Sequence, residues 1–333
     1  MEDLVSGEVE AKGSRWKRVL SWLPGLVLLA GLVAVVSHFA EGKEFAEMLR
    51  QARPGWLLAG ALLQGATYVC AAAVWQRALR KGRARCTVRS LVPVAVARLF
   101  VDQVIPTGGF GGRLVVVRAL RRRGVHTGLA VAAILVDLLT LYVAFAVCVI
   151  ASLAIIAAVS KINHLVLVLA GLFPIFALSI PVTVLWFSSK REREPPRWLH
   201  RLPKADELLR EISRAPRRLV RNRTVLLEAG LLQLAIFVLD GATLATMLLA
   251  VGHPASPLAS FAAFTFAQVA ATVLLVPGGL GTFEASSVAL LALFKVPVEA
   301  ALAATLLLRG LTYWLPMLPG FLLSRREIRG KRR

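Results

Sequence analysis

The chain has 333 residues, 57% of them hydrophobic, and its mean hydropathy is +0.69. This composition excludes an ordinary soluble globular protein and predicts an all-α, polytopic membrane protein. The formal net charge of +21 does not indicate a nucleic-acid partner, because the Lys and Arg residues lie in blocks beside apolar runs and no nucleic-acid-reading motif accompanies them.

Six apolar runs have the length of a spanning helix, which is about 20 residues for a hydrocarbon core of ~30 Å. In chain order these runs are 20–39, 56–76, 127–158, 163–188, 224–251 and 299–323. Two further apolar runs, 90–105 and 258–294, are broken by glycine-rich turns. Since no polar segment is long enough to fold separately, we expect a single transmembrane domain over 20–323.

The basic blocks set the orientation of the predicted helices. They place an N-terminal segment 1–19, a loop 189–223 and a tail 324–333 in the cytoplasm. With both termini inside, the run 90–112 must enter and leave on the inner face, and the run 258–294 on the outer face. We therefore predict about six spanning helices and two re-entrant helical hairpins in the inner membrane of a bacterium, with the basic segments on anionic lipid headgroups.

The two glycine-rich turns, 106–112 and 277–281, are 171 residues apart. The same ungapped shift carries a tyrosine onto a tyrosine and several alanines onto alanines, which indicates that the chain contains two copies of one unit. The copies are about 56–158 and 224–323. Because their hairpins enter from opposite faces, we predict an inverted repeat, whose usual consequence is a site near the membrane midplane.

A broken helix exposes backbone N–H and C=O groups that lipid cannot satisfy, so we expect the turns to be buried in protein or to line a polar cavity. The helix after each turn would direct free N–H groups and its positive dipole end toward the break, which suits a phosphate headgroup. Alternatively, the glycines only form tight turns and allow close packing. The candidate substrate-binding residues in the turns are Gly108, Gly109, Gly111, Gly112, Pro277, Gly278, Gly279 and Gly281.

Ionisable side chains within apolar runs are further candidates for a binding site, because a charge at bilayer depth is costly unless it is paired or functional. These candidates are Arg113, Asp137, Glu284 and Arg309. The Arg309 guanidinium either binds an anion or forms a buried ion pair with Glu284 or Asp137. Arg98 and Asp102 are four residues apart on one helix face, and we expect a structural ion pair between them.

No motif in the sequence indicates a cofactor, a metal or an enzyme's active site. The five histidines lack the short spacing of a zinc site, and no nucleotide-binding fingerprint is present. The three cysteines suggest neither a disulfide framework nor a thiolate site. We therefore expect no cofactor, no bound metal and no enzymatic activity.

Four segments resemble the lysylphosphatidylglycerol synthase transmembrane domain family, whose members are also called flippase-like integral membrane proteins. The segments are 102–112, the helix around Asp137, 277–284 and 307–314, and the resemblance extends over about 20–323. It implies a lipid-flipping membrane domain and a site role for Glu284, Arg309 and the glycines of both turns. The chain ends nine residues after Ser324, so we expect a stand-alone member without the family's synthase domain.

The first half departs from the family pattern at two positions. Arg113 stands where an acidic residue is common, and Leu138 stands where an arginine is common, which would suit a different headgroup. The resemblance favours a translocase that moves a phospholipid or related amphiphile between leaflets, with membrane lipids as its partners. The alternatives are a membrane-embedded transferase that modifies a lipid, and a non-transporting partner of a lipid-synthesis enzyme.

Overall fold

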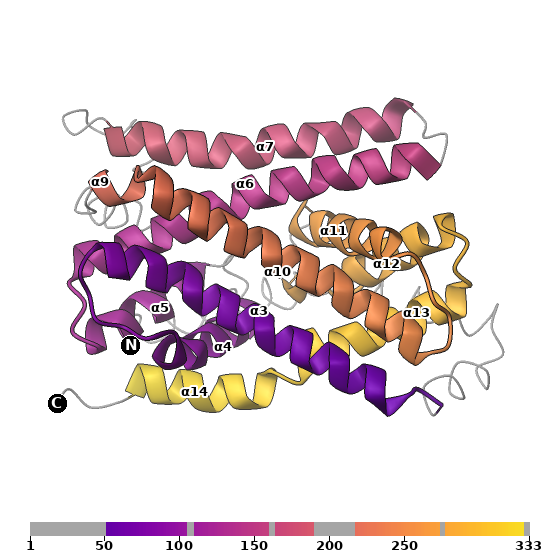
Figure 1. Cartoon of the computed structure of the whole chain (residues 1–333), viewed down its shortest axis with the longest axis horizontal. Coiled ribbons are helices and arrows are strands. Elements are labelled where there is room, and N and C mark those ends of the chain that lie inside the picture. Colours follow the sequence, from indigo (N-terminus) through magenta and orange to yellow (C-terminus); the bar gives the residue numbers. More distant parts are fainter. Residues whose placement is uncertain (1–50, 105–109, 160–163, 190–216, 274–276, 330–333) are drawn as a thin grey trace, which may run out of the picture.

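The computed structural model describes residues 51–104, 110–159, 164–189, 217–273 and 277–329, and in these ranges it is all-helical, without strands (Figure 1). Four helical segments are long and apolar enough to cross a membrane: α3 (Pro54–Lys81), α6 (Thr127–Val159), α10 (Arg223–Ala250) and the stretch Val298–Glu327. They coincide with four of the six predicted spans. The predicted span 20–39 lies outside the described residues.

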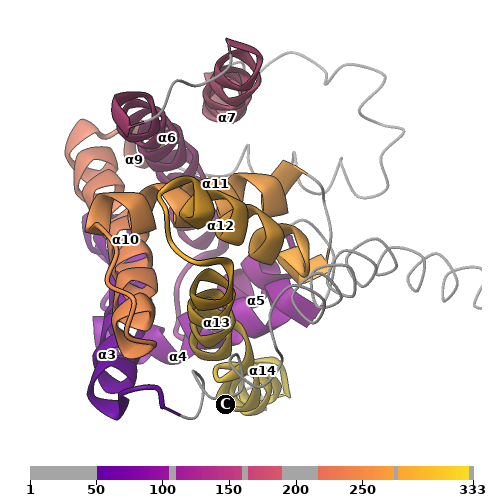
Figure 2. The ribbon, with the colours of Figure 1, turned by 90° about the vertical axis from the view of Figure 1, so that its right-hand side faces the viewer.

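The helix α7 (His164–Ser189) covers the predicted run 163–188 and packs along α6, on the side of the molecule away from α3 (Figures 1 and 2). Its exposed side chains include Leu172, Ile175 and Phe176. Exposed apolar residues of this size are expected where a helix faces lipid. Most of the predicted basic loop lies outside the described residues, and its last part forms the short α9 (Arg217–Val220).

The helices α3 and α10 have the same length, 28 residues each, and lie antiparallel against one another (Figure 1). Three polar contacts fix their register from one end to the other: Arg53 N to Ala250 O at 3.0 Å, Gln64 Nε2 to Asp240 Oδ1 at 2.8 Å, and Arg77 Nη1 to Glu228 Oε2 at 3.4 Å. The pair therefore stays in contact through the whole depth of the bundle.

Two helical hairpins occupy the places where the sequence predicts broken helices. The first consists of α4 (Val88–Val104) and α5 (Phe110–Arg122), which pack against each other. The second consists of α11 (Pro257–Val273) and α12 (Thr282–Leu293), with the short helical turn η2 (Pro277–Gly279) between them. All four arms are shorter than the about 20 residues that a crossing needs.

The last segment of the chain is also interrupted. It consists of α13 (Val298–Arg309), a single π-helical turn η3 (Gly310–Trp314) and α14 (Met317–Arg329), which packs on α4 (Figure 2). Within this turn Leu315 N donates to Gly310 O at 2.8 Å, a bond across five residues. Such turns often occur at functional sites, and here Thr312 contacts Gln103 of the first hairpin and Tyr313 contacts Gly278 of the second.

Arg123 fastens one end of the first hairpin to α14. Its guanidinium donates to both carboxylate oxygens of Glu327 at 2.8 and 2.9 Å, and to the backbone oxygens of Ser90 and Ala119 at 3.1 and 2.9 Å. The hydrogen bond with Glu327 raises the pKa of Arg123. Because bidentate pairs of this kind are strong and directional, they tie α4, α5 and α14 together at this end.

The buried core consists of two main clusters. One is formed mainly by α3, α4, α5 and the first part of α6, and the other mainly by α11, α12, α13 and the last part of α6, while α10 contributes to both. Alanine is frequent in both clusters. Small side chains let helix backbones approach closely, which is how helices associate in a lipid environment.

At Gly241, the helix α10 approaches the backbone of α11 closely. A Cβ added there would lie 2.9 Å from Phe261 Cα, a backbone atom that cannot swing away. Gly241→Ala should therefore force the two helices apart and destabilise the protein by about 1–3 kcal/mol. The control is Gly230→Ala in the same helix, where an added Cβ meets nothing within 4 Å. Equal melting temperatures of the two purified variants would contradict the close approach.

Candidate functional site

The interrupted ends of the two hairpins meet inside the protein. The end of α4 contacts η2, and Gln103 Nε2 donates to Thr312 O in η3 at 3.4 Å. In an α-helix this carbonyl would accept from the residue four positions later, which is Pro316 and has no N–H. Gln103 therefore donates to a carbonyl that lacks its α-helical donor, and it links the first hairpin to the last segment of the chain.

The second turn depends on glycine for its backbone conformation. Gly278, Gly279 and Gly281 have φ values of 65°, 64° and 79°. Residues with a Cβ disfavour this left-handed region by about 1–2 kcal/mol each. At Gly278 there is also no space, because an added Cβ would lie 2.5 Å from Tyr313 Oη. The sequence signal for this turn therefore reflects a true backbone requirement.

Glu284 and Arg309 form a buried ion pair that holds both ends of this turn. Glu284 Oε1 accepts from Arg309 Nε at 2.7 Å, and Glu284 Oε2 accepts from Gly281 N at 2.7 Å. Arg309 Nη2 donates to Gly278 O at 2.5 Å. The two side chains are 2% and 11% exposed, respectively. Charge-assisted bonds in a dry site are strong, so the pair defines the shape of the turn.

The Arg309 guanidinium also lies between two aromatic rings. Its Cζ is 5.0 Å from the ring centre of Phe283 and 4.6 Å from that of Tyr313, distances at which a cation is attracted to the ring face. Nε and Nη2 are used by Glu284 and Gly278, whereas Nη1 makes no hydrogen bond to any residue that the structure describes. Arg309 thus keeps donor capacity beside the break.

The first turn has a corresponding arrangement. Asp102 Oδ1 accepts from Gly112 N at 3.0 Å, near the start of α5, and Asp102 Oδ2 lies 3.4 Å from Arg98 Nε. Arg98 Nη1 also donates to Asp137 Oδ2 at 2.8 Å, and Gln233 Nε2 donates to Asp137 Oδ1 at 3.0 Å. At both breaks, therefore, a carboxylate accepts from a backbone N–H of the turn and pairs with an arginine.

The structure brings most of the predicted site residues together at these two turns. The expected pair of Arg98 and Asp102 is present, and Asp137 joins it. Arg309 pairs with Glu284, one of the two partners that the sequence leaves open, and the other, Asp137, pairs with Arg98.

The remaining predicted residues lie at the same breaks. Arg113 interacts electrostatically with the charges of the first turn. Gly111 and Gly112 belong to the first turn of α5, and Pro277 begins η2. Gly108 and Gly109 lie outside the described residues.

Sequence reasoning missed the uncharged polar partners of the site. Gln233 holds the second oxygen of Asp137, Gln103 caps the carbonyl of Thr312, and Trp75 lies with its ring centre 5.6 Å from Arg98 Cζ. A glutamine inside an otherwise apolar helix is the signal that could have found the first two, since a polar side chain in a span needs a partner.

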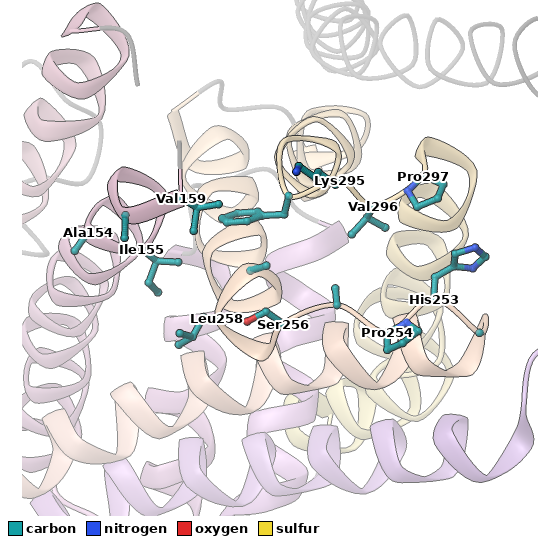
Figure 3. Close-up of a pocket in the computed structure, with 15 residues that line it drawn as sticks. Ala154, Ile155, Val159, His253, Pro254, Ser256, Leu258, Lys295, Val296 and Pro297 are labelled. Atoms are coloured by element: carbon teal, nitrogen blue, oxygen red, sulfur yellow. The ribbon is translucent and has the colours of Figure 1, made fainter. Parts of the chain in front are cut away.

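A separate pocket of about 810 Å³ opens at the end of the bundle where α6 ends and α11 begins (Figure 3). Its walls are mainly apolar, with His253, Ser256 and Lys295 as polar residues. Lys295 has a positive φ of 64°, in the turn between α12 and α13. No residue that the sequence predicts as part of the site lines this pocket.

The fold and site together define a polytopic membrane protein with two interrupted helical hairpins, whose turns are each held by an arginine–carboxylate pair. The chain belongs to the family described as Lysylphosphatidylglycerol synthase TM region, whose sequence profile matches residues 22–320. This match covers nearly the whole chain and confirms the resemblance seen in the sequence. No curated protein matches the chain.

Proposed function

We propose that this protein is a lipid translocase that moves a phospholipid or a related amphiphile between the leaflets of a bacterial inner membrane. The observation that carries the proposal is the meeting of two broken hairpins inside an apolar bundle, with Arg98 and Arg309 at the breaks. Irregular backbone and charged side chains at membrane depth are typical of substrate pathways.

The proposed architecture is an inverted repeat of two halves, with the breaks near the midplane. One observation that supports it concerns α3, which begins at Pro54, and α10, which begins at Arg223. These two helices are equally long and antiparallel. Likewise α4 and α11 have 17 residues each, and each forms the first arm of a helical hairpin. Alternating access to a central site is the usual mechanism of such folds.

In this mechanism the arginines recognise the phosphate of the headgroup, while the acyl chains remain in lipid. A guanidinium can bind phosphate through two parallel hydrogen bonds. When no headgroup is present, Glu284 neutralises Arg309, because an unpaired buried charge would cost about 3–5 kcal/mol. An arriving phosphate would take over donors of Arg309 and loosen its hold on the turn at Gly278.

Leaflet exchange of a fluorescent phospholipid in liposomes tests the proposal directly. Purified protein should accelerate exchange over protein-free liposomes, and the recovered lipid should be chemically unchanged. New lipid species would instead support a transferase. Lack of exchange for every phospholipid tested, together with co-purification of a lipid-synthesis enzyme, would favour a non-transporting partner.

Thr87→Cys and Ser256→Cys test the inverted arrangement. The two residues are exposed and precede α4 and α11, which are corresponding helices. In a background without Cys70, Cys86 and Cys148, a membrane-impermeant thiol reagent added to intact cells should label Ser256→Cys only. Thr87→Cys should react after the cells are opened, because it lies on the cytoplasmic side with both termini. Labelling of both positions from the same side would overturn the inversion.

A further inference from the structure

Asp240 is an acidic residue in the middle of a spanning helix, and the proposed headgroup site does not use it. It lies ten residues before the end of α10, which corresponds to about 15 Å along a helix, half of a ~30 Å hydrocarbon core. Gln64 Nε2 donates to its Oδ1 at 2.8 Å. Asp102, Asp137 and Glu284 each pair with an arginine, whereas no cation of the described residues lies within 4.0 Å of Asp240.

The groups around Asp240 do not neutralise a negative charge. From α3, Gln64 also donates to Thr243 Oγ1 at 3.1 Å. Tyr68 interacts electrostatically with Asp240, and its buried Oη has no hydrogen-bond partner among the residues that the structure describes. α11 has no titratable side chain along its length. Asp137 of α6 accepts from Gln233 of α10, which lies two turns before Asp240.

The cations on the helices that pack against α10 are either paired or lie far along the helix from Asp240. Arg80 and Lys81 are in the last turn of α3, at least 16 residues after Gln64, which is about 24 Å along a helix, and α9 lies before the start of α10. Arg309 of α13 is held by Glu284. Arg77 of α3 pairs with Glu228 near the opposite end of α10. An ionised Asp240 would therefore be a lone charge at the most costly depth of the membrane.

We propose that Asp240 is a proton-binding site that couples lipid movement to the proton gradient, an inference that rests on the proposed translocase function. The proton adds to Oδ2, which converts the carboxylate to a neutral carboxylic acid, while Oδ1 keeps the hydrogen bond from Gln64. No other co-reactant is needed, because the proton comes from water on one side and leaves to water on the other.

The position of Asp240 explains how protonation and transport are linked. α3 and α10 come from different halves of the proposed repeat, and Asp240 lies at their contact. An ionised carboxylate requires water, so it favours a state in which this contact is parted and hydrated. The protonated acid favours the closed contact. Proton entry from one face and exit to the other therefore biases the exchange between the two states.

The first test detects proton binding without any lipid transport. Infrared difference spectra of the reconstituted protein, recorded between acidic and alkaline pH, should contain a C=O band of a protonated carboxyl group. Asp240→Asn should remove this band, whereas Glu228→Gln, which changes an exposed carboxylate of the same helix, should retain it. Persistence of the same bands in Asp240→Asn, or their absence from the wild type, would overturn the inference.

The second test measures coupling. With one proton per lipid, a pH difference of one unit should shift the leaflet distribution of a fluorescent phospholipid by up to about tenfold. Asp240→Asn should retain exchange without a gradient and lose its dependence on the gradient, while Glu228→Gln should behave as the wild type. A gradient response that survives in Asp240→Asn would overturn the coupling. If the wild type moves no lipid at all, the translocase proposal itself fails, whereas the infrared result still decides whether Asp240 binds a proton.

Discussion

Arg309→Ala should abolish protein-dependent lipid exchange and destabilise the protein by about 3–5 kcal/mol. The change removes the cation that neutralises the buried carboxylate of Glu284, and it also removes the donor to the carbonyl of Gly278. The loss should appear both in the exchange rate in liposomes and in the melting temperature of the solubilised protein.

Two further variants separate the headgroup role of Arg309 from its structural role. Glu284→Gln with Arg309→Met removes both charges, so it should recover much of the lost stability without recovering exchange. Arg77→Ala breaks a pair whose side chains are 39% and 45% exposed, and it should change stability by at most about 1 kcal/mol and leave exchange intact. Wild-type exchange in the doubly neutral variant would show that the Arg309 charge does not bind the lipid.

Gly278→Ala should be the most damaging single methyl group that can be added to the second turn. The backbone at this position has a φ of 65°, and the new Cβ would lie 2.5 Å from Tyr313 Oη, close to the ring that flanks Arg309. The conformational strain alone costs about 1–2 kcal/mol. We expect a lower melting temperature and a strong reduction of exchange.

The matched control is Gly310→Ala, which lies next to Arg309 at the start of η3. Its backbone is helical, with a φ of −54°, and an added Cβ would meet nothing within 4 Å. This variant should retain the wild-type melting temperature and exchange rate. If Gly278→Ala and Gly310→Ala behave alike, the turn has no special conformational requirement.

The hydrophobic pattern was sufficient to predict the all-helical fold and four of its long apolar segments, because a bilayer imposes their length. The glycine-rich turns were equally informative, because a left-handed backbone such as that of Gly281 favours glycine over every other residue. The spacing of Arg98 and Asp102 also identified a contact within one helix turn.

Contacts between helices could not be derived in the same way. Arg309 pairs with Glu284 across 25 positions, and Gln233 reaches Asp137 across 96. Such pairs depend on the rotation and tilt of each helix, which hydropathy does not report. The π-helical turn Gly310–Trp314 was also hidden. Pro316 follows it in the sequence, but Gln103, which donates to Thr312 O, is 209 positions away.

The hydrogen bonds of Arg123 couple the position of α14 to that of the first hairpin. One guanidinium holds a carboxylate and two backbone carbonyls from three helix ends, so these ends cannot separate independently. A tilt of the hairpin must therefore swing α14, whose far end is the joint at η3, where Tyr313 touches Arg309. A displacement of the helix ends around Arg123 would thus be transmitted to the Arg309 guanidinium inside the bundle.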